Sequence, residues 1–268
     1  MRTLTLGIDR TGIELREFVR EREALFFVFL FPVLMLALFS AVFSNQFGGA
    51  DAAPGVNAAR HFLPAMTAAG LLLTSFQSMA IGVATERDDG TLKRLRGTPL
   101  PAASYFLGKI GMVLVSSAAQ FGLLILVAWA VFRVQLPSDA QHWLTFAWTF
   151  ALGVGTGTIC GIAYSSFIPN ARSATPIVVA PALILQFISG VYLSYPDLPR
   201  WLQQIAAVFP LKWIAQGERS VFLPDSLRSQ EVAHSWQHAE TALVLGGWSL
   251  AALVVALLTF RWISKRPA

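Results

Sequence analysis

Six stretches of this chain, each 20 or more residues long, contain no Asp, Glu, Lys or Arg. They cover residues 24–50, 61–85, 110–132, 140–171, 173–196 and 241–260. An α-helix rises about 1.5 Å per residue, so about 20 residues cross the ~30 Å hydrocarbon core of a bilayer. After trimming of polar ends, we predict six transmembrane helices at about 24–44, 62–85, 106–132, 143–168, 173–195 and 241–260. The run 121–131 is apolar on every face, unlike the alternating strands of a membrane β-barrel.

Charged residues are scarce in the chain as a whole. They make up 13% of it, whereas soluble domains average about 25%. This composition argues against a soluble enzyme, and also against a disordered chain, which would be rich in charge. Cys160 is the only cysteine, which excludes a disulfide framework within the chain. The sequence therefore predicts an all-α integral membrane protein in which residues 1–268 form a single transmembrane domain.

Lys and Arg are unevenly divided between the segments that join the predicted spans. With the N-terminus inside, the cytoplasmic segments hold 14 of them: Arg2, Arg10, Arg16, Arg20, Arg22, Arg87, Lys93, Arg94, Arg96, Lys109, Arg172, Arg261, Lys265 and Arg266. The outer segments hold six: Arg60, Arg133, Arg200, Lys212, Arg219 and Arg228. The positive-inside rule then predicts that both termini of this multi-pass membrane protein are cytoplasmic. The basic character of the chain, with a net charge of +5, comes mostly from the Lys and Arg of the cytoplasmic segments. We therefore expect membrane lipid and no nucleic acid as a partner.

Residues 4–22 are predicted to form an amphipathic helix that lies on the membrane. Leu4, Ile8, Leu15, Phe18 and Val19 share one face at helical spacing, and most charged residues fall elsewhere. The alternative is a solvated cytoplasmic helix that leads into the first span.

The outer segment 196–240 contains two further apolar pieces, neither of which is long enough to span. Leu198, Trp201, Leu202, Ile205 and Phe209 recur at helical spacing, and Pro210 then breaks the helix before the second piece. We predict short re-entrant or interfacial helices between the fifth and sixth spans, with Trp201 and Trp213 as anchors at the membrane interface.

The loop at residues 86–100 follows the second span and is rich in charge. It reads Glu-Arg-Asp-Asp-Gly-Thr-Leu-Lys-Arg-Leu-Arg-Gly-Thr-Pro-Leu. Leu92 and Leu95 are three residues apart and share a face of a predicted short helix, with basic residues around them. A helix this short is marginal alone in water, so an exposed apolar pair indicates a docking surface. Alternatively, the two leucines pack back onto the ends of the chain's own helices.

This loop resembles the signature of the type-2 ABC transporter permeases, the membrane subunits of many bacterial exporters. Their pattern is an acidic-Arg-acidic run, Gly-Thr-Leu, a second Leu, Thr-Pro-Leu and a Gly-Lys that enters the third helix. The matching residues are Glu86, Arg87, Asp88, Gly90, Thr91, Leu92, Leu95, Thr98, Pro99, Leu100, Gly108 and Lys109. The N-terminal helix, the six spans and the outer segment also match, so the resemblance covers essentially the whole chain. It is nearest to drug exporters of the daunorubicin-resistance type.

The resemblance implies that the loop is a coupling helix seated in a groove of a separate ATP-binding subunit. The implied coupling residues are Glu86, Arg87, Gly90, Thr91, Leu92, Leu95 and Arg96. This chain would then be a transport subunit and not an enzyme, with no cofactor of its own, while the partner ATPase binds ATP and Mg. The sequence has no G-x-x-x-x-G-K-[ST] motif, as this division of labour requires. A second permease copy, identical or paralogous, is the other expected partner.

The substrate path is predicted from the family's geometry, which places the second and fifth helices along the dimer axis. The candidates there are Thr74, Phe76, Gln77, Gln186 and Phe187. An amide at membrane depth needs a partner, so a helix–helix hydrogen bond is the alternative for the two glutamines. The cavity helices carry no acidic residue, so we expect an amphipathic or hydrophobic compound: a drug, an antibiotic or a lipid. Export of an envelope lipid or polysaccharide is the alternative within the family, and an ATP-independent membrane enzyme or assembly factor is the alternative outside it.

The remaining chemical candidates are weak. His234 and His238 are four residues apart, which suits a metal, but a polar helix end is the simpler interpretation, and we expect no metal site. The glycines at 153, 155 and 157 lie inside an apolar span, where they favour close helix packing over a dinucleotide-binding loop. No Asp, His or Glu lies deep in a predicted span, so we expect no catalytic residue of an intramembrane hydrolase.

Overall fold

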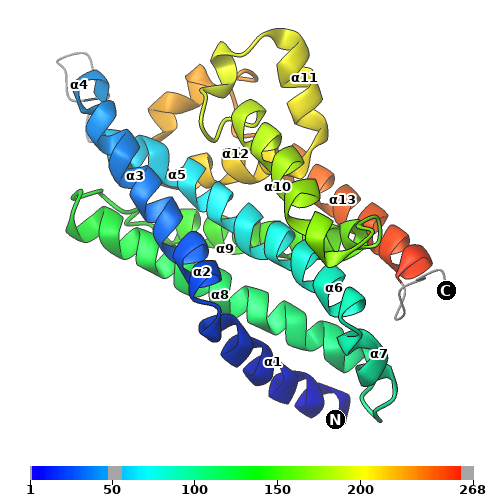
Figure 1. Cartoon of the computed structure of the whole chain (residues 1–268). Coiled ribbons are helices and arrows are strands. Elements are labelled where there is room, and N and C mark those ends of the chain that lie inside the picture. The colour runs from blue at the N-terminus through cyan, green and yellow to red at the C-terminus, as the bar shows by residue number, and fades with distance from the viewer. Residues whose placement is uncertain (1, 48–55, 261–268) are drawn as a thin grey trace.

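The computed structural model describes residues 2–47 and 56–260, and over these ranges the chain is helical with no strand. The α-helices are α1 (Arg2–Arg20), α2 (Arg22–Leu25), α3 (Phe31–Val42), α4 (Ser44–Phe47), α5 (Ala58–Leu71), α6 (Ser78–Asp88), α7 (Thr91–Arg96), α8 (Ala102–Ala130), α9 (Ala140–Ser165), α10 (Ala171–Ile188), α11 (Arg200–Val208), α12 (Pro210–Phe222) and α13 (His238–Thr259) (Figure 1). Two π-helical turns, η1 (Phe26–Leu30) and η2 (Leu72–Gln77), join α2 to α3 and α5 to α6. Short 3₁₀ turns, η3 (Tyr195–Asp197) and η4 (Asp225–Gln230), lie in the segment after α10.

Five helical stretches are long and apolar enough to cross a membrane. They are Ala58–Asp88, Ala103–Ala130, Ala140–Ser165, Ala171–Ile188 and His238–Thr259. These match the second to sixth predicted spans. The first predicted span, 24–44, contains a shorter apolar helix, Phe26–Val42. The count of six spans therefore stays a prediction, as does the sidedness, and Arg261, Lys265 and Arg266 of the charge count lie outside the described residues.

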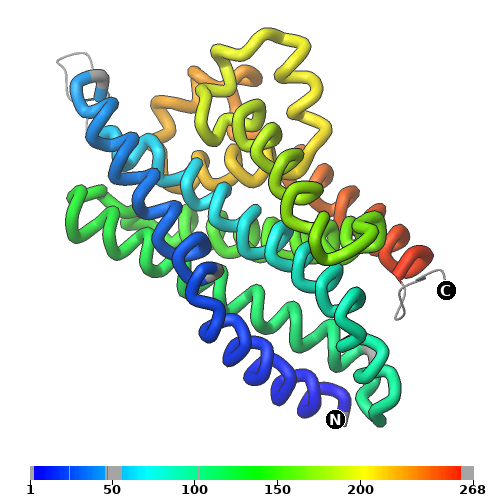
Figure 2. The backbone as a smooth tube through the Cα atoms, in the orientation of Figure 1, coloured from blue at the N-terminus to red at the C-terminus, as the bar shows by residue number. Residues whose placement is uncertain are grey.

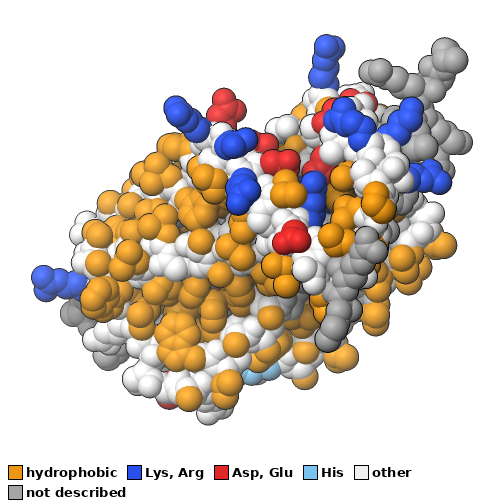
Figure 3. Space-filling view, turned by 90° about the horizontal axis from the view of Figure 1, so that it is seen from below, with side chains coloured by type: hydrophobic (Ala, Val, Ile, Leu, Met, Phe, Trp, Pro, Cys, Tyr) orange, Lys and Arg blue, Asp and Glu red, His pale blue; other side chains and the backbone are white. Residues whose placement is uncertain are grey.

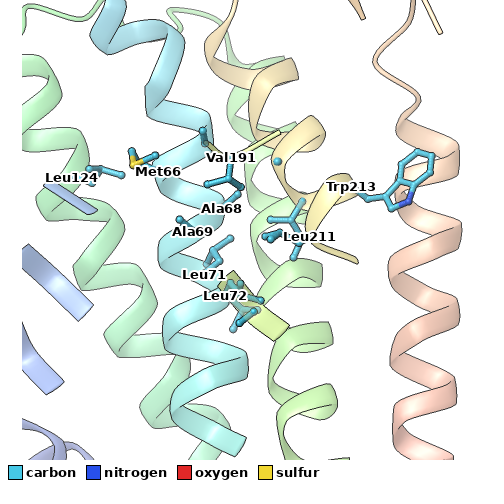
Figure 4. Packing of buried hydrophobic residues seen from close by; sticks show 14 of the residues in the cluster. Met66, Ala68, Ala69, Leu71, Leu72, Leu124, Val191, Leu211 and Trp213 are labelled. Atoms are coloured by element: carbon cyan, nitrogen blue, oxygen red, sulfur yellow. The ribbon is translucent and has the colours of Figure 1, made fainter. Parts of the chain in front are cut away.

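The continuous helix α5–η2–α6 forms the centre of the bundle. Small residues line α5, so neighbouring helices approach closely; α3, α8, α9 and α12 all pack against it. Figure 4 shows Met66 of α5 facing Leu124 of α8, and Leu71 and Leu72 facing Leu211 of α12. The tube in Figure 2 shows the same helix crossing the middle of the molecule with the others around it. The core of the bundle is thus built around the second predicted span.

Close packing of α9 accounts for the predicted glycine run. A Cβ at Gly157 would collide with Ser75, and one at Gly153 would lie 3.4 Å from Ile214 of α12. These two glycines let η2 and α12 approach α9, as expected for packing. No neighbour lies within 4 Å of a Cβ at Gly155, so that glycine makes no such contact.

Helix α1 packs lengthwise on α8, but the predicted apolar stripe is divided. Leu4, Ile8 and Val19 are exposed, whereas Leu15 and Phe18 pack against the core. The side of α1 that faces α8 carries the buried carboxyl of Glu14. The placement of α1 on the membrane therefore stays a prediction, and Leu4, Ile8 and Val19 remain available for it.

The outer segment forms two helices with different surroundings. Helix α11 exposes Trp201, Ile205 and Val208, as expected of an interfacial helix, whereas α12 is buried among α5, α9 and α13. The assignment of Trp213 as an exposed anchor is wrong: this residue is 7% exposed, and its indole Nε1 donates to the carbonyl of Ala207 at 2.7 Å.

Both ends of the described chain lie at the end of the bundle that carries α7. Helix α1 runs along the start of α8, and the ring of Phe260 packs on Phe106 of α8 at 5.1 Å between centroids. Figure 3 shows an apolar surface over most of one face, with the charged side chains gathered toward one edge. The arrangement agrees with two termini on one side of a membrane.

Candidate functional site

Helix α7 begins at a glycine whose backbone conformation is unfavourable for other residues. Gly90 has a φ of +81°, in the left-handed region, and turns the chain sharply after α6. The Oδ1 atom of Asp89 accepts the backbone N–H of Thr91 at 2.8 Å, which satisfies one of the free donors at the helix start. The helix ends before Pro99, which has no N–H to continue it. The loop therefore holds one short, well-defined helix, as predicted.

The two leucines of α7 have different environments. Leu92 is fully buried against the chain itself, which is the alternative anticipated for both leucines. Leu95 is half-buried and keeps part of its side chain at the surface, between the exposed side chains of Lys93, Arg94 and Arg96. The surface of α7 is thus mainly basic, with one apolar residue in it.

Three consecutive residues at the end of α6, just before α7, join α6 to three other helices. Glu86 accepts hydrogen bonds from the Tyr105 hydroxyl, at 2.7 Å, and from Lys109, both on α8. Arg87 donates to the carbonyl of Ser165, at 2.9 Å, and to that of Ile168, at the end of α9. The Oδ2 atom of Asp88 accepts the N–H of Ala171 at the start of α10, at 3.0 Å. We call Glu86, Arg87 and Asp88 the anchor triplet.

A buried ionic cluster extends this junction to α1. The Lys109 ammonium is bonded to Glu86 and, at 2.6 Å, to Glu14 of α1, whose other oxygen pairs with Arg10 at 2.5 Å. A Cβ at Gly108 would collide with Arg10, so the glycine of the Gly-Lys pair allows α1 to reach Lys109. Two carboxylates and two cations balance one another here, as buried charges require. The sequence analysis missed Glu14 and Tyr105, although the i, i+4 spacing of Arg10 and Glu14 could have indicated a paired carboxylate.

The predicted path residues lie on two elements that contact each other, η2 for Thr74, Phe76 and Gln77 and α10 for Gln186 and Phe187. The Thr74 hydroxyl bonds to Ser117 of α8 at 2.7 Å, and Phe76 packs on Tyr164 of α9, so both serve contacts between helices. Phe187 is 43% exposed and packs edge-on against Tyr192.

Gln77 and Gln186 are buried, and neither amide has a hydrogen-bond partner among the described residues. The helix–helix hydrogen bond considered for them is therefore not formed between the helices that the structure describes. The bond between Asp88 of α6 and Ala171 of α10 marks a common level on the two helices. Gln77 lies 11 residues before Asp88, and Gln186 lies 15 residues after Ala171. Their heights differ by about 6 Å, or one helical turn. Gln77 also ends the π-turn η2, a distortion that is frequent at functional sites.

The histidines considered for a metal are used in other contacts. The Nδ1 atom of His234 lies 2.7 Å from the carbonyl of Ser229, and Nε2 of His238 lies 2.9 Å from the Ser220 hydroxyl. Ligand atoms of Glu14, Glu17 and Glu86 come within 4.8 Å of one another. Lys109 already occupies two of these three carboxylates, so this group forms an ion-pair network.

Comparison with known proteins supports the resemblance found in the sequence. A family model described as "ABC-2 type transporter" matches residues 11–223. Two curated proteins, from Escherichia coli strain K12 and from Escherichia coli O157:H7, are similar over 154 residues at 26% identity, and each is described as a "Probable multidrug ABC transporter permease YbhR". The similar region covers 55% of this chain and 39% of each relative. The chain therefore matches well under half the length of these relatives.

Proposed function

Because the chain belongs to the ABC-2 type transporter family, we propose that it is the membrane subunit of an ATP-driven exporter. It moves an amphipathic or hydrophobic compound out across the bacterial cytoplasmic membrane by alternating access. A separate ATPase chain binds ATP and Mg and hydrolyses the nucleotide. The transporting unit contains two permease chains, either identical or paralogous.

The observation that carries this proposal is the attachment of the end of α6, which leads directly into α7. Helix α7 presents a basic surface with Leu95 in it, and the anchor triplet behind it bonds to α8, α9 and α10. A surface helix that served only as a connection would need no such attachment to three helices. An ATPase that pushes on α7 would instead move the ends of all three together.

The chemistry of α7 suits a groove with acidic and apolar lining. Lys93, Arg94 and Arg96 supply positive charge, which speeds the encounter with an acidic surface and fixes its register. Leu95 supplies apolar area, and burying one leucine is worth roughly 1.5–3 kcal/mol. Leu92 acts from the inside, where it joins α7 to the rest of the chain.

The substrate path is proposed to run beside η2 and α10. Gln77 and Gln186 offer amides that no described residue satisfies, which suits a polar group of a ligand or of the second permease chain. Pro176 and Pro181 interrupt the hydrogen bonds of α10 and favour bending. The multidrug description belongs to the relatives, and it favours a drug over an envelope lipid as the cargo of this chain.

Co-purification tests the docking role of α7. The full chain is expressed with the candidate ATPase subunit, and ATPase recovery is compared for wild type, Leu95→Asp and Val232→Asp. A charge at Leu95 would be buried without a partner in the interface, so Leu95→Asp is expected to lose most of the ATPase. Val232, an exposed apolar residue of the outer segment, is the matched control and is expected to have no effect. Equal recovery with Leu95→Asp and wild type rejects α7 as the docking helix.

A further inference from the structure

One carboxyl in the interior of the bundle has no partner. Glu218 of α12 is 0% exposed, and neither of its oxygens accepts or donates a hydrogen bond among the described residues. Glu218 forms no ion pair with another described residue either. This glutamate is therefore isolated from the other charges of the molecule, unlike Glu14 and Glu86.

The surroundings of Glu218 follow from its neighbours one turn away on α12. Ile214 lies over Gly153 of α9, while the ring of Phe222 lies 6.1 Å from Phe121 of α8 and 6.0 Å from Phe146 of α9. Residues four apart share a helix face, so Glu218 lies between Gly153 of α9 on one side and the rings around Phe222 on the other.

Glu218 also lies deep in the bundle. The preceding residue, Gly217, is packed against Thr149, nine residues after the start of α9. Thr149 lies six residues, or about 9 Å, beyond the start of the predicted span 143–168, which is nearly a third of a ~30 Å hydrocarbon core. Glu218 falls within the predicted outer segment 196–240, whereas the predicted absence of acidic residues concerns the second and fifth helices alone. Because α12 folds inward, the structure brings a carboxyl to that depth.

A carboxyl at membrane depth is costly, and such residues are usually kept for a function. Alone, Glu218 is favoured in its neutral form, but a cation beside it favours the ionised form. Aromatic rings near a carboxylate add cation–π attraction and apolar contact, which together suit a positive charge carried on a hydrophobic body.

We propose that Glu218 binds the positively charged group of amphipathic cations that this exporter carries. The inference rests on the proposed function and narrows its substrate class. Glu218 is closed off in the present conformation, so the cation reaches it in the state in which α12 and α9 separate.

The test uses two hydrophobic ions of similar size and shape and opposite charge. Binding of tetraphenylphosphonium and of tetraphenylborate to the purified full-length chain is measured by equilibrium dialysis. The wild type is expected to prefer the cation. Glu218→Gln is expected to weaken cation binding by about tenfold or more and to leave anion binding unchanged, since a charge-assisted contact is lost.

Two variants control for charge and for position. Glu218→Asp keeps the carboxylate and is expected to retain most of the preference for the cation. Glu240→Gln makes the same substitution at an exposed position on α13 and is expected to bind both ions like wild type. Unchanged cation binding by Glu218→Gln, or equal binding of the two ions by wild type, overturns the proposal.

A second measurement needs no variant. Dicyclohexylcarbodiimide adds to protonated carboxyls in apolar surroundings to form an N-acylurea, and mass spectrometry locates the modified residue. Glu218 is expected to be labelled, with tetraphenylphosphonium and not tetraphenylborate protecting it. Labelling without protection contradicts the proposal. The absence of labelling also contradicts it, because a path that admits tetraphenylphosphonium to Glu218 would also admit dicyclohexylcarbodiimide.

The proposed function is judged by other readouts. Loss of ATPase binding in the Leu95→Asp experiment concerns α7 alone and is unaffected by ion binding at Glu218. If α7 recruits the ATPase and Glu218→Gln binds the cation normally, only the substrate inference fails. If Glu218 prefers the cation but α7 recruits no ATPase, only the proposed coupling fails.

Discussion

Among the charged residues, Lys109 joins three separate helices. Its ammonium lies between carboxylates from α1 and α6, and its own helix is α8. Buried ion pairs add little stability relative to apolar packing, but removal of one partner leaves an uncompensated charge. The cluster therefore makes the arrangement of these three helices specific.

Replacement of this cation is expected to be strongly destabilising. Lys109→Met leaves Glu86 and part of Glu14 without a counter-charge, and we expect a loss of about 3–5 kcal/mol. The melting temperature of the purified chain, followed by tryptophan fluorescence, measures it. The triple variant Lys109→Met, Glu14→Gln, Glu86→Gln removes both signs of charge and is expected to recover most of the loss. An unchanged melting temperature for Lys109→Met would show that the cluster contributes nothing.

Residue roles could be predicted from sequence only in part. The shared face of Leu92 and Leu95 follows from their spacing, but which of them turns inward depends on the packing of α7 on α6. The burial of Glu218 could not be predicted, because its helix has the polarity of a surface helix. Gln77 and Gln186 could be singled out from sequence, because polar residues are conspicuous in apolar spans, but the lack of a partner for their amides could not.

At the scale of elements, spans are predicted well and local distortions are not. The predicted span 143–168 corresponds to α9, Ala140–Ser165, with both ends displaced by three residues. Long charge-free runs determine such helices, because unpaired backbone groups are too costly in lipid. The π-turn η2 leaves no comparable mark on the sequence, since it depends on the fit between α5–α6 and its neighbours.

The contact between α9 and α6 gives a prediction at this scale. A Cβ at Gly161 would lie 2.7 Å from the backbone oxygen of Phe76, which cannot move without displacing the helix. Gly161→Ala is therefore expected to destabilise the chain by about 1–3 kcal/mol, as overpacking does.

Gly155→Ala is the matched control in the same helix. A Cβ at Gly155 meets no atom within 4 Å, and alanine favours helix over glycine by about 1 kcal/mol. Thermal unfolding of both variants decides the matter: the expected order is Gly155→Ala at or above wild type, with Gly161→Ala below it. Equal melting temperatures would mean that α9 does not depend on this close approach.

At the scale of the whole molecule, the sequence indicates which helices form, whereas the bonds between distant helices are seen only in the structure. The family pattern identifies the anchor triplet as three adjacent residues, whereas their bonds to α8, α9 and α10 join positions up to 83 residues apart. No local pattern contains such pairings. The central claim depends on them: a push on α7 reaches the transport helices through the anchor triplet.

Arg87 allows that claim to be tested, because it lies behind α7 and ties α6 to the end of α9. Its replacement by alanine removes the connection while it leaves the exposed surface of α7 intact. Arg133→Ala, at an exposed position between α8 and α9, is the matched control.

The decisive measurement is the amount of Hoechst 33342 exported per ATP hydrolysed. It is made in proteoliposomes that contain the full chain and its ATPase subunit, with wild type, Arg87→Ala and Arg133→Ala compared. The account predicts that Arg87→Ala keeps its ATPase and continues to hydrolyse ATP, but exports several-fold less dye per ATP than wild type and Arg133→Ala. Export per ATP at the wild-type level with Arg87→Ala would contradict the claim that the anchor triplet carries the work of ATP into the membrane.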